Sequence, residues 1–150
     1  MNAVIAAAAE LQAVCESEGW RFCLIGGIAL QRWGEARETV DVDLTLLTGF
    51  GAEAPFIARL TRVFRARIDD ASAFALANRV LRTCSAEDLI VLKAFADRPR
   101  DWADIEGILI RQTGSLDWGM VRDELAPLLE LKESPESLDR LEQLRARLGA

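Results

Sequence analysis

Two short apolar segments with glycines and aspartates at fixed places constrain this sequence more than any other feature. Residues 22–25 are apolar and end in Gly26-Gly27, and residues 40–44 alternate aliphatic side chains with Asp41 and Asp43. Successive side chains of a strand point to opposite faces. We therefore expect both aspartates on one face of a second strand, with the aliphatic residues Val40, Val42 and Leu44 entering the core.

These residue types suit a divalent metal that carries a nucleoside triphosphate. Gly26 and Gly27 permit close backbone approach, and a helix beginning near Ile28 would direct its N-terminus at phosphate oxygens. Thirteen residues separate Gly27 from Asp41, enough for a short helix and a return loop that bring the carboxylates beside the glycines. Carboxylate oxygens are ligands that Mg²⁺ prefers. The alternatives are an ordinary tight turn and an edge strand with an acidic solvent face.

Composition limits the classes of protein and of site. The 150 residues predict a single domain, 1–150, and the net charge of -6 does not favour broad non-specific binding to nucleic acid. The absence of histidine excludes a histidine base and most zinc sites. Cys15, Cys23 and Cys84 are widely spaced in apolar surroundings, which predicts reduced core residues. With neither a signal-like start nor a long apolar run, we expect a cytoplasmic protein that does not enter membranes.

The periodicity predicts a few early strands followed by helices. Ser85 and Asp88 have the spacing of a capping box at the start of one of these helices. This order predicts an α+β domain, in which a mixed sheet within residues 20–70 is flanked by helices and a helical part follows over 71–150. The expected strands are 21–25 and 40–47, and the expected helices are 3–18, 28–33, 56–68, 71–81, 86–98, 101–112, 118–131 and 135–148.

Three ordered blocks carry a resemblance to a known family. They are Gly26-Gly27-Ile28-Ala29-Leu30, the stretch 37–44 that ends in Asp-Val-Asp-Leu, and the segment 85–105 with Lys93, Asp101 and Asp104. Together they resemble the DNA polymerase beta-like nucleotidyltransferase superfamily, and within it the small bacterial nucleotidyltransferases related to AbiEii-type toxins. The resemblance covers about residues 10 to 115.

The resemblance implies roles for particular side chains. It implies that Gly26 and Gly27 contact the triphosphate, that Asp41 and Asp43 hold Mg²⁺ or Mn²⁺, and that an NTP is the substrate. By the same resemblance, Arg37 and Thr39 steady the phosphates or the aspartate strand. Lys93 has two interpretations, a nucleotide contact or an ion pair with Asp101 or Asp104. These two aspartates lie one helical turn apart and therefore share a face of the helix. Their alternatives are to orient Lys93 or the substrate, or merely to solvate the helix.

The sequence departs from the family at one place. Active members supply a third carboxylate from a later strand, but residues 71–84 contain no Asp or Glu. Asp69 and Asp70 precede an expected helix and are poor substitutes. A missing general base alone lowers rates by about 10²–10⁴-fold, so the sequence leaves catalytic activity open.

Three hypotheses follow from these patterns. The first is a metal-dependent nucleotidyltransferase that transfers NMP from an NTP to an RNA or protein hydroxyl, as a toxin with a cognate antitoxin partner. The second is a catalytically impaired nucleotidyltransferase fold that binds a nucleotide or a partner protein. The third is a helical interaction module whose early strands are only scaffold.

Overall fold

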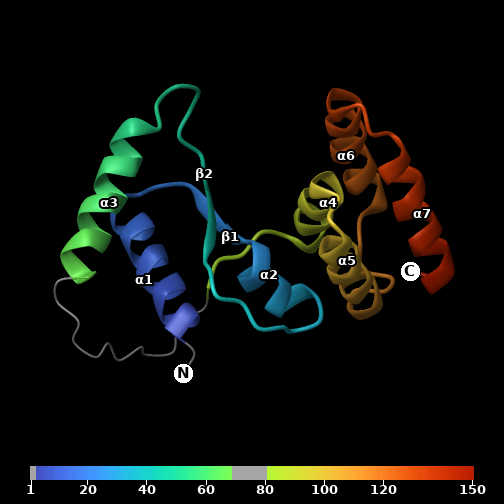
Figure 1. Cartoon of the computed structure of the whole chain (residues 1–150), viewed down its shortest axis with the longest axis horizontal. Helices are drawn as coiled ribbons and strands as arrows, with labels where there is room; N and C mark the ends of the chain where they lie inside the picture. Colours follow the sequence, from blue (N-terminus) through green and yellow to red (C-terminus); the bar gives the residue numbers. More distant parts are fainter. Residues whose placement is uncertain (1–2, 69–80) are drawn as a thin grey trace.

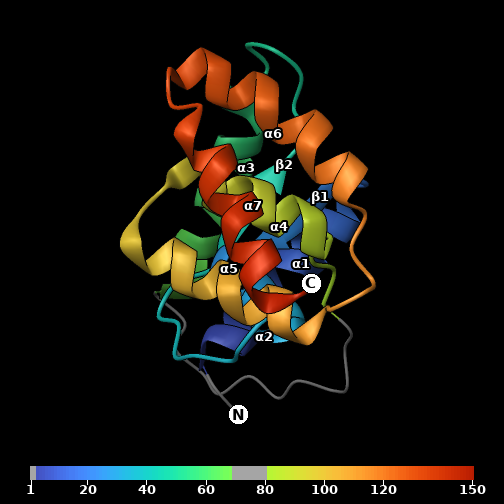
Figure 2. The ribbon, with the colours of Figure 1, turned by 90° about the vertical axis from the view of Figure 1, so that its right-hand side faces the viewer.

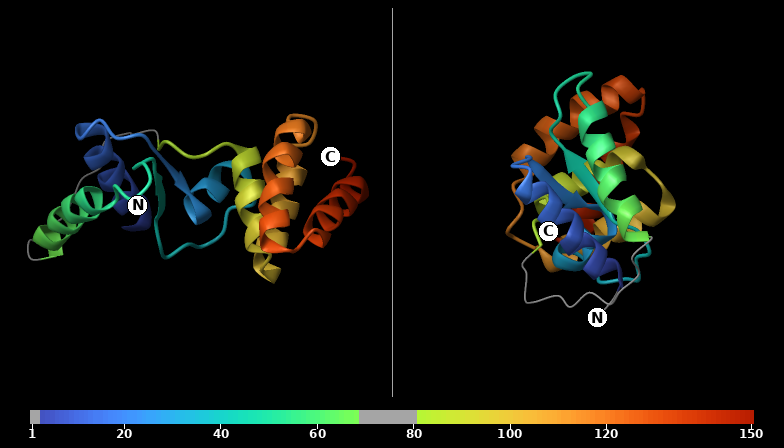
Figure 3. Two further views of the ribbon diagram at one scale, coloured as in Figure 1. Left: turned by 90° about the horizontal axis from the view of Figure 1, so that it is seen from above. Right: turned by 90° about the vertical axis from the view of Figure 1, so that its left-hand side faces the viewer.

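A small sheet lies between two groups of helices (Figure 1). The computed structural model describes residues 3–68 and 81–150 of the chain. The helices α1 and α3 lie on one side of the sheet and α4 to α7 on the other, and α2 continues directly from the end of β1 (Figures 1 and 3). The elements are α1 (Ala3–Ser17), β1 (Phe22–Ile25), α2 (Gly26–Trp33), β2 (Asp43–Leu46), α3 (Ala54–Ile68), α4 (Ala86–Ala96), α5 (Pro99–Arg111), α6 (Trp118–Lys132) and α7 (Glu136–Leu148).

The two strands pair antiparallel, and one face of the pair is apolar. Phe22 pairs with Leu46 and Leu24 with Leu44. These side chains pack with α1 in a core cluster whose most buried members include Leu24 and Cys15. Alternation of side chains across a strand thus buries one face and leaves the other for Asp43 and its neighbours.

The segment before α4 also contacts β1. Leu24 and Thr83 form an isolated parallel bridge. The Leu24 amide donates to the Arg82 carbonyl, and the Cys84 amide donates to the Leu24 carbonyl, both at 2.9 Å. β1 is therefore held on both edges, and among the described residues only β2 forms a regular strand beside it.

The expected mixed sheet flanked by helices is wrong for the part of the chain that the structure describes. The only sheet there is two-stranded and antiparallel, and helices make up most of the described chain. The second strand begins at Asp43 rather than at residue 40, and Val40, expected in the core, is 86% exposed. Side-chain contacts of Arg37 and Thr39, rather than strand pairing, fix this stretch. The expected helix 71–81 lies outside the described residues, apart from Leu81.

The C-terminal half is a helical bundle built around α4. Leu89, Ile90 and Ala94 of α4 are at most 1% exposed, and α5, α6 and α7 surround this helix (Figure 2). Its predicted capping box is confirmed. The Asp88 amide donates to the Ser85 hydroxyl at 2.9 Å, and the Ser85 amide donates to the Asp88 carboxylate at 3.3 Å.

The end of α2 anchors the sheet to this bundle. The Trp33 indole N–H donates to the Cys84 carbonyl at 2.7 Å, and the Gln112 side chain donates to the Trp33 carbonyl at 3.0 Å. Arg111 donates to the Gly34 carbonyl. A Cβ on Gly34 would lie 2.6 Å from a Leu30 methyl and 3.0 Å from Ile108, so only glycine allows this close approach.

The cysteine prediction is confirmed for Cys15 and Cys84, which are free and buried, whereas Cys23 is free but half-buried. Burial raises the pKa of Cys84 to about 12, with Cys23 and Asp88 adding to it. Of the four tryptophans, Trp102 is buried and the other three are half-buried. No helix in the described ranges is long and apolar enough for a membrane span.

The capping box gives a stability prediction. Ser85→Ala removes the acceptor of the Asp88 amide, and we expect unfolding to become easier by about 1 kcal/mol. Urea denaturation followed by circular dichroism measures this change. Ser115→Ala, in the turn after α5, is the control and should cost less than half as much. An equal loss for both variants would contradict the assignment of Ser85 as the cap.

Candidate functional site

A cleft of about 530 Å³ opens where the end of the sheet meets the helical bundle. The residues that line it come from the glycine turn, from the segment between α2 and β2, from the first residue of β2, and from the α4–α5 region. Eight of the nine site residues predicted from the sequence line this cleft, and Asp104 lies behind it, bound to Lys93. The lining residues are Gly26, Gly27, Arg37, Glu38, Thr39, Val40, Asp41, Asp43, Lys93, Arg98, Arg100 and Asp101.

The glycine turn is shaped by the two side chains that press against it. Gly26 has φ +59°, a backbone conformation that favours glycine. A Cβ on Gly26 would lie 2.0 Å from an Asp43 carboxylate oxygen, and a Cβ on Gly27 would lie 2.3 Å from the Thr39 hydroxyl. Both glycines are therefore needed for the approach of Asp43 and Thr39, in addition to any contact with a ligand.

The same turn starts α2, whose first turn contains no acidic residue. Its unpaired backbone amides and the positive end of its dipole favour anions. Because Gly26 and Gly27 line the cleft, this end of the helix faces it. The turn thus offers an anion site directly beside the carboxylate of Asp43.

The two predicted metal ligands reach the cleft from different kinds of backbone. Asp43 is the first residue of β2 and pairs with Ile25, whereas Asp41 lies in the irregular segment before the strand. Both are exposed. Thr39 is 5% exposed, and its hydroxyl donates to the Asp41 carboxylate at 3.0 Å. A buried hydroxyl, rather than strand pairing, therefore orients Asp41.

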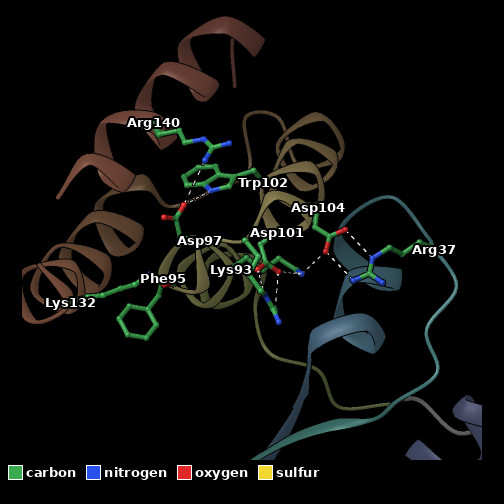
Figure 4. Close-up of polar contacts among 10 residues, drawn as sticks. Arg37, Lys93, Phe95, Asp97, Asp101, Trp102, Asp104, Lys132 and Arg140 are labelled. Atoms are coloured by element: carbon green, nitrogen blue, oxygen red, sulfur yellow. Dashed lines mark hydrogen bonds and ion pairs between the residues drawn. The ribbon is translucent and has the colours of Figure 1, made fainter. Parts of the chain in front are cut away.

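Lys93 is buried in a network of ion pairs (Figure 4). The lysine is 6% exposed, and its ammonium group donates to Asp104 at 2.6 Å and to Asp101 at 3.4 Å. Arg37 binds Asp104 through two nitrogens at 3.0 and 3.1 Å, and Arg98 binds Asp101 at 2.6 and 3.2 Å. The ion-pair interpretation of Lys93 is thus the one observed, and it involves both aspartates.

The network also links the segment that carries Asp41 to the helical bundle. Arg37 belongs to the segment between α2 and β2, and its partner Asp104 belongs to α5. Asp101 and Asp104 are 2% and 7% exposed, so each carboxylate exchanged water for a bidentate arginine and a shared lysine. Such charge-assisted pairs fix geometry more strongly than neutral hydrogen bonds.

The balance of charges lowers the pKa of both buried carboxyls. Burial alone would raise the pKa of Asp104, but hydrogen bonds from Arg37 and Lys93 outweigh it and hold the pKa below its ordinary value. Burial likewise opposes the shift at Asp101, where the hydrogen bond from Arg98 and the charge of Lys93 lower the pKa. Both groups are therefore carboxylates at neutral pH.

Arg98 and Arg100 are cleft residues to which the sequence analysis gave no role. Arg98 precedes Pro99 at the start of α5, and its side chain is 74% exposed although Asp101 binds its guanidinium group. Arg100 is exposed and forms no ion pair within the described ranges. Their place in the sequence could have indicated a role at the site, because both arginines flank Pro99 immediately before Asp101. They add positive charge on the wall of the cleft supplied by α5.

The two exposed carboxylates of the cleft have the chemistry of divalent-metal ligands. Within residues 3–68 and 81–150, no three His, Cys, Asp or Glu side chains are grouped to hold a metal. Asp41 and Asp43 are an oxygen donor set that suits Mg²⁺, which commonly binds one or two carboxylates and completes its shell with phosphates and water.

The third carboxylate expected from the family is missing from the segment beside β1. Residues 82–84, which run parallel to β1 at the bridge, are Arg, Thr and Cys. The Thr83 hydroxyl accepts a hydrogen bond from Arg32 at 3.3 Å. Asp69 and Asp70 lie outside the described residues.

No protein-family model matches the chain. A search of curated proteins likewise finds no match to its sequence. The family resemblance therefore stays a prediction from the sequence.

The lowered pKa values predict how stability depends on pH. A carboxyl whose pKa is lower in the folded state stabilises the fold above its unfolded pKa of about 3.9, and this contribution is lost as the pH falls through the folded pKa. We expect Asp104→Asn to be less stable than the wild type at pH 5–7, with a difference that shrinks below about pH 4. Urea denaturation across this pH range measures the difference. Asp123→Asn, an exposed carboxylate on α6, should show almost no difference, and a pH-independent gap for Asp104→Asn would contradict the ion-pair assignment.

The contact between Gly26 and Asp43 gives a second prediction for the site. Gly26→Ala should lower the free energy of unfolding by about 1–2 kcal/mol for the backbone strain of a positive φ, plus about 1 kcal/mol for rotation of Asp43. Gly49→Ala is the matched control, since Gly49 has φ +80° with open space around it and should show only the backbone cost. In the double variant Gly26→Ala/Asp43→Ala the excess should disappear, as measured by urea denaturation. An excess that persists would show that Asp43 is not what requires glycine there.

Proposed function

We propose that this chain binds an NTP together with Mg²⁺ or Mn²⁺ in the cleft and transfers NMP to a hydroxyl group of RNA or protein. The observation that carries the proposal is the meeting, in one cleft, of the glycine turn with Asp41 and Asp43. The glycine turn and the start of α2 favour the triphosphate, and the two carboxylates favour the metal. The ordered sequence blocks that resemble nucleotidyltransferases support the same chemistry.

The proposed reaction assigns a task to each wall of the cleft. The acceptor oxygen forms a bond to the α-phosphorus, the bond to the bridging oxygen of the β-phosphate breaks, pyrophosphate leaves, and the acceptor proton passes to solvent. The metal, when bound, neutralises phosphate charge. Gly26 and Gly27 hold phosphate oxygens through their amides, and Arg98 and Arg100 stabilise negative charge on the leaving group.

Lys93 acts in this proposal by positioning other groups. Its ammonium group is bound to Asp101 and Asp104, which in turn orient Arg98 and Arg37 at the cleft. Replacing Lys93 with a neutral residue would leave two buried carboxylates without the ammonium group that they share. Their repulsion would then loosen both arginines. Asp101 and Asp104 thus serve as orienting residues, and Thr39 does the same for Asp41.

A second candidate is a protein that binds the nucleotide without transferring it. The observation in its favour is that residues 82–84, beside β1, offer no carboxylate as a base for the acceptor hydroxyl. In either case we propose a cytoplasmic protein with a cognate antitoxin as its partner. Support for this comes from the AbiEii-type sequence blocks and from three free cysteines, which suit a reducing compartment.

Calorimetric titration with ATP and Mg²⁺ or Mn²⁺ tests the binding. We expect metal-dependent binding that weakens at least tenfold, about 1.4 kcal/mol, in Asp41→Asn and in Asp43→Asn. Asp123→Asn is the control and should bind as the wild type does. Absence of ATP binding by the wild type would overturn both candidates and leave the helical interaction module.

Transfer is tested separately with α-labelled NTPs and total RNA or protein. Label on an acceptor, lost in Asp43→Asn, supports the transferase. ATP binding without transfer to either acceptor supports the second candidate instead.

A further inference from the structure

The face of β2 that carries Asp43 leads from the cleft to a second hollow. Antiparallel partners place their side chains on the same face, so Asp43 lies beside Ile25, and Thr45 lies beside Cys23. The pairing continues beyond β2, because the Leu47 amide donates to the Arg21 carbonyl at 3.0 Å. Asp43, Thr45 and Leu47 therefore follow one another along a single face, with the cleft at one end and Arg21 at the other.

This hollow, of about 360 Å³, contains positive charge without a balancing carboxylate. Arg21 and Arg82 are the charged residues among those that line it, and both are exposed. Neither forms an ion pair with any residue that the structure describes. The lining residues are Trp20, Arg21, Phe22, Cys23, Thr45, Leu47 and Arg82.

The walls of the hollow are apolar and partly aromatic. The Arg82 guanidinium carbon lies 5.6 Å from the centre of the Phe22 ring. Leu47 is 61% exposed, and Trp20 packs against Phe56 with ring centroids 4.7 Å apart. Two exposed guanidinium groups without a carboxylate partner, one of them beside an aromatic ring, match a ligand that combines a phosphate with a planar base.

The position of the hollow indicates an extended ligand. Asp43 and Leu47 are four residues apart, about 13 Å along a strand, which is farther than a single phosphate group reaches. A ligand that occupies both sites must therefore be a chain with anionic groups along it. Single-stranded RNA has such groups at every nucleotide, together with bases that stack on guanidinium and aromatic planes.

We propose that the hollow of Arg21 and Arg82 binds the backbone of a single-stranded RNA whose terminal hydroxyl lies in the cleft. This inference rests on the proposed function and selects RNA over protein as the acceptor. It adds a binding site outside the metal and nucleotide cleft, on the far end of the same sheet face. An RNA strand that joins the two sites would pass over Thr45, whose side chain is exposed.

Fluorescence anisotropy with a labelled 12-nucleotide single-stranded RNA of mixed sequence tests the site. We expect Arg21→Gln/Arg82→Gln to weaken RNA binding at least tenfold. The dependence of log K on log salt should become shallower by about 1.4, as expected for two phosphate contacts to a single strand. Arg122→Gln/Arg147→Gln removes two exposed arginines of the helical bundle and serves as the matched control, with unchanged RNA affinity. Calorimetric titration with ATP and Mg²⁺ should be unchanged in all these variants.

Leu47→Glu gives an independent test, because Leu47 lies on the surface and the new carboxylate would repel phosphate without removing core packing. RNA binding should fall in this variant as well, while circular dichroism remains that of the wild type. RNA binding that is equal in the wild type, the double variant and Leu47→Glu would overturn the proposed site. Arginine-dependent binding of polyglutamate with no binding of RNA would overturn the choice of RNA. Absence of ATP binding by the wild type would instead contradict the proposed function. Failure of the RNA site and failure of the proposed function are therefore distinguishable.

Discussion

The buried ion-pair network around Lys93 determines how the two halves of this molecule meet. An ammonium group in the helical bundle has little access to water, and only Asp101 and Asp104 make its burial tolerable. Each aspartate needs a second cation, and one of these, Arg37, comes from the segment between α2 and β2. Removal of a single partner from such a buried set typically costs about 3–5 kcal/mol, because an uncompensated charge remains. The network therefore specifies one arrangement of that segment against α5.

The position of this segment decides the chemistry available in the cleft. Arg37 ties its beginning to α5, Thr39 is buried against Gly27, and the Thr39 hydroxyl holds Asp41. Asp43 then starts β2 with its carboxylate pressed against Gly26. The two carboxylates are thus supported independently, one by a hydroxyl and one by a strand. A cleft built in this way is organised before any ligand arrives, which lowers the ordering cost of binding.

The sequence predicted which residues meet in the cleft better than it predicted the sheet around them. Gly-Gly after an apolar run and Asp-Val-Asp are local signals, because glycine freedom and strand alternation depend on few neighbours. The prediction that Val40 enters the core was wrong, because side chains alternate between two faces only inside a strand, and the strand starts at Asp43.

Contacts between distant parts of the chain were harder to predict. The pairing of Lys93 with both aspartates was left open, since spacing along a helix does not reveal what packs against it. The burial of Thr39 depends on an irregular segment, where periodicity gives no direction for side chains. The helices of the bundle were predicted well. A capping box marks the start of α4 and amphipathic periodicity marks α5 and α7, and both signals are properties of the helix itself.

Charge is distributed unevenly over a protein whose net charge is -6. In the cleft, Lys93, Arg37 and Arg98 face Asp101 and Asp104, so most of the positive charge there is neutralised. The hollow of Arg21 and Arg82 has no acid among its lining residues. An acidic protein repels polyanions at distances beyond about 10 Å only weakly at moderate salt, because the field is screened. Local, uncompensated arginines therefore matter more than net charge for where a polyanion would bind, and Arg21 and Arg82 lie at the end of the strand face that leads into the cleft.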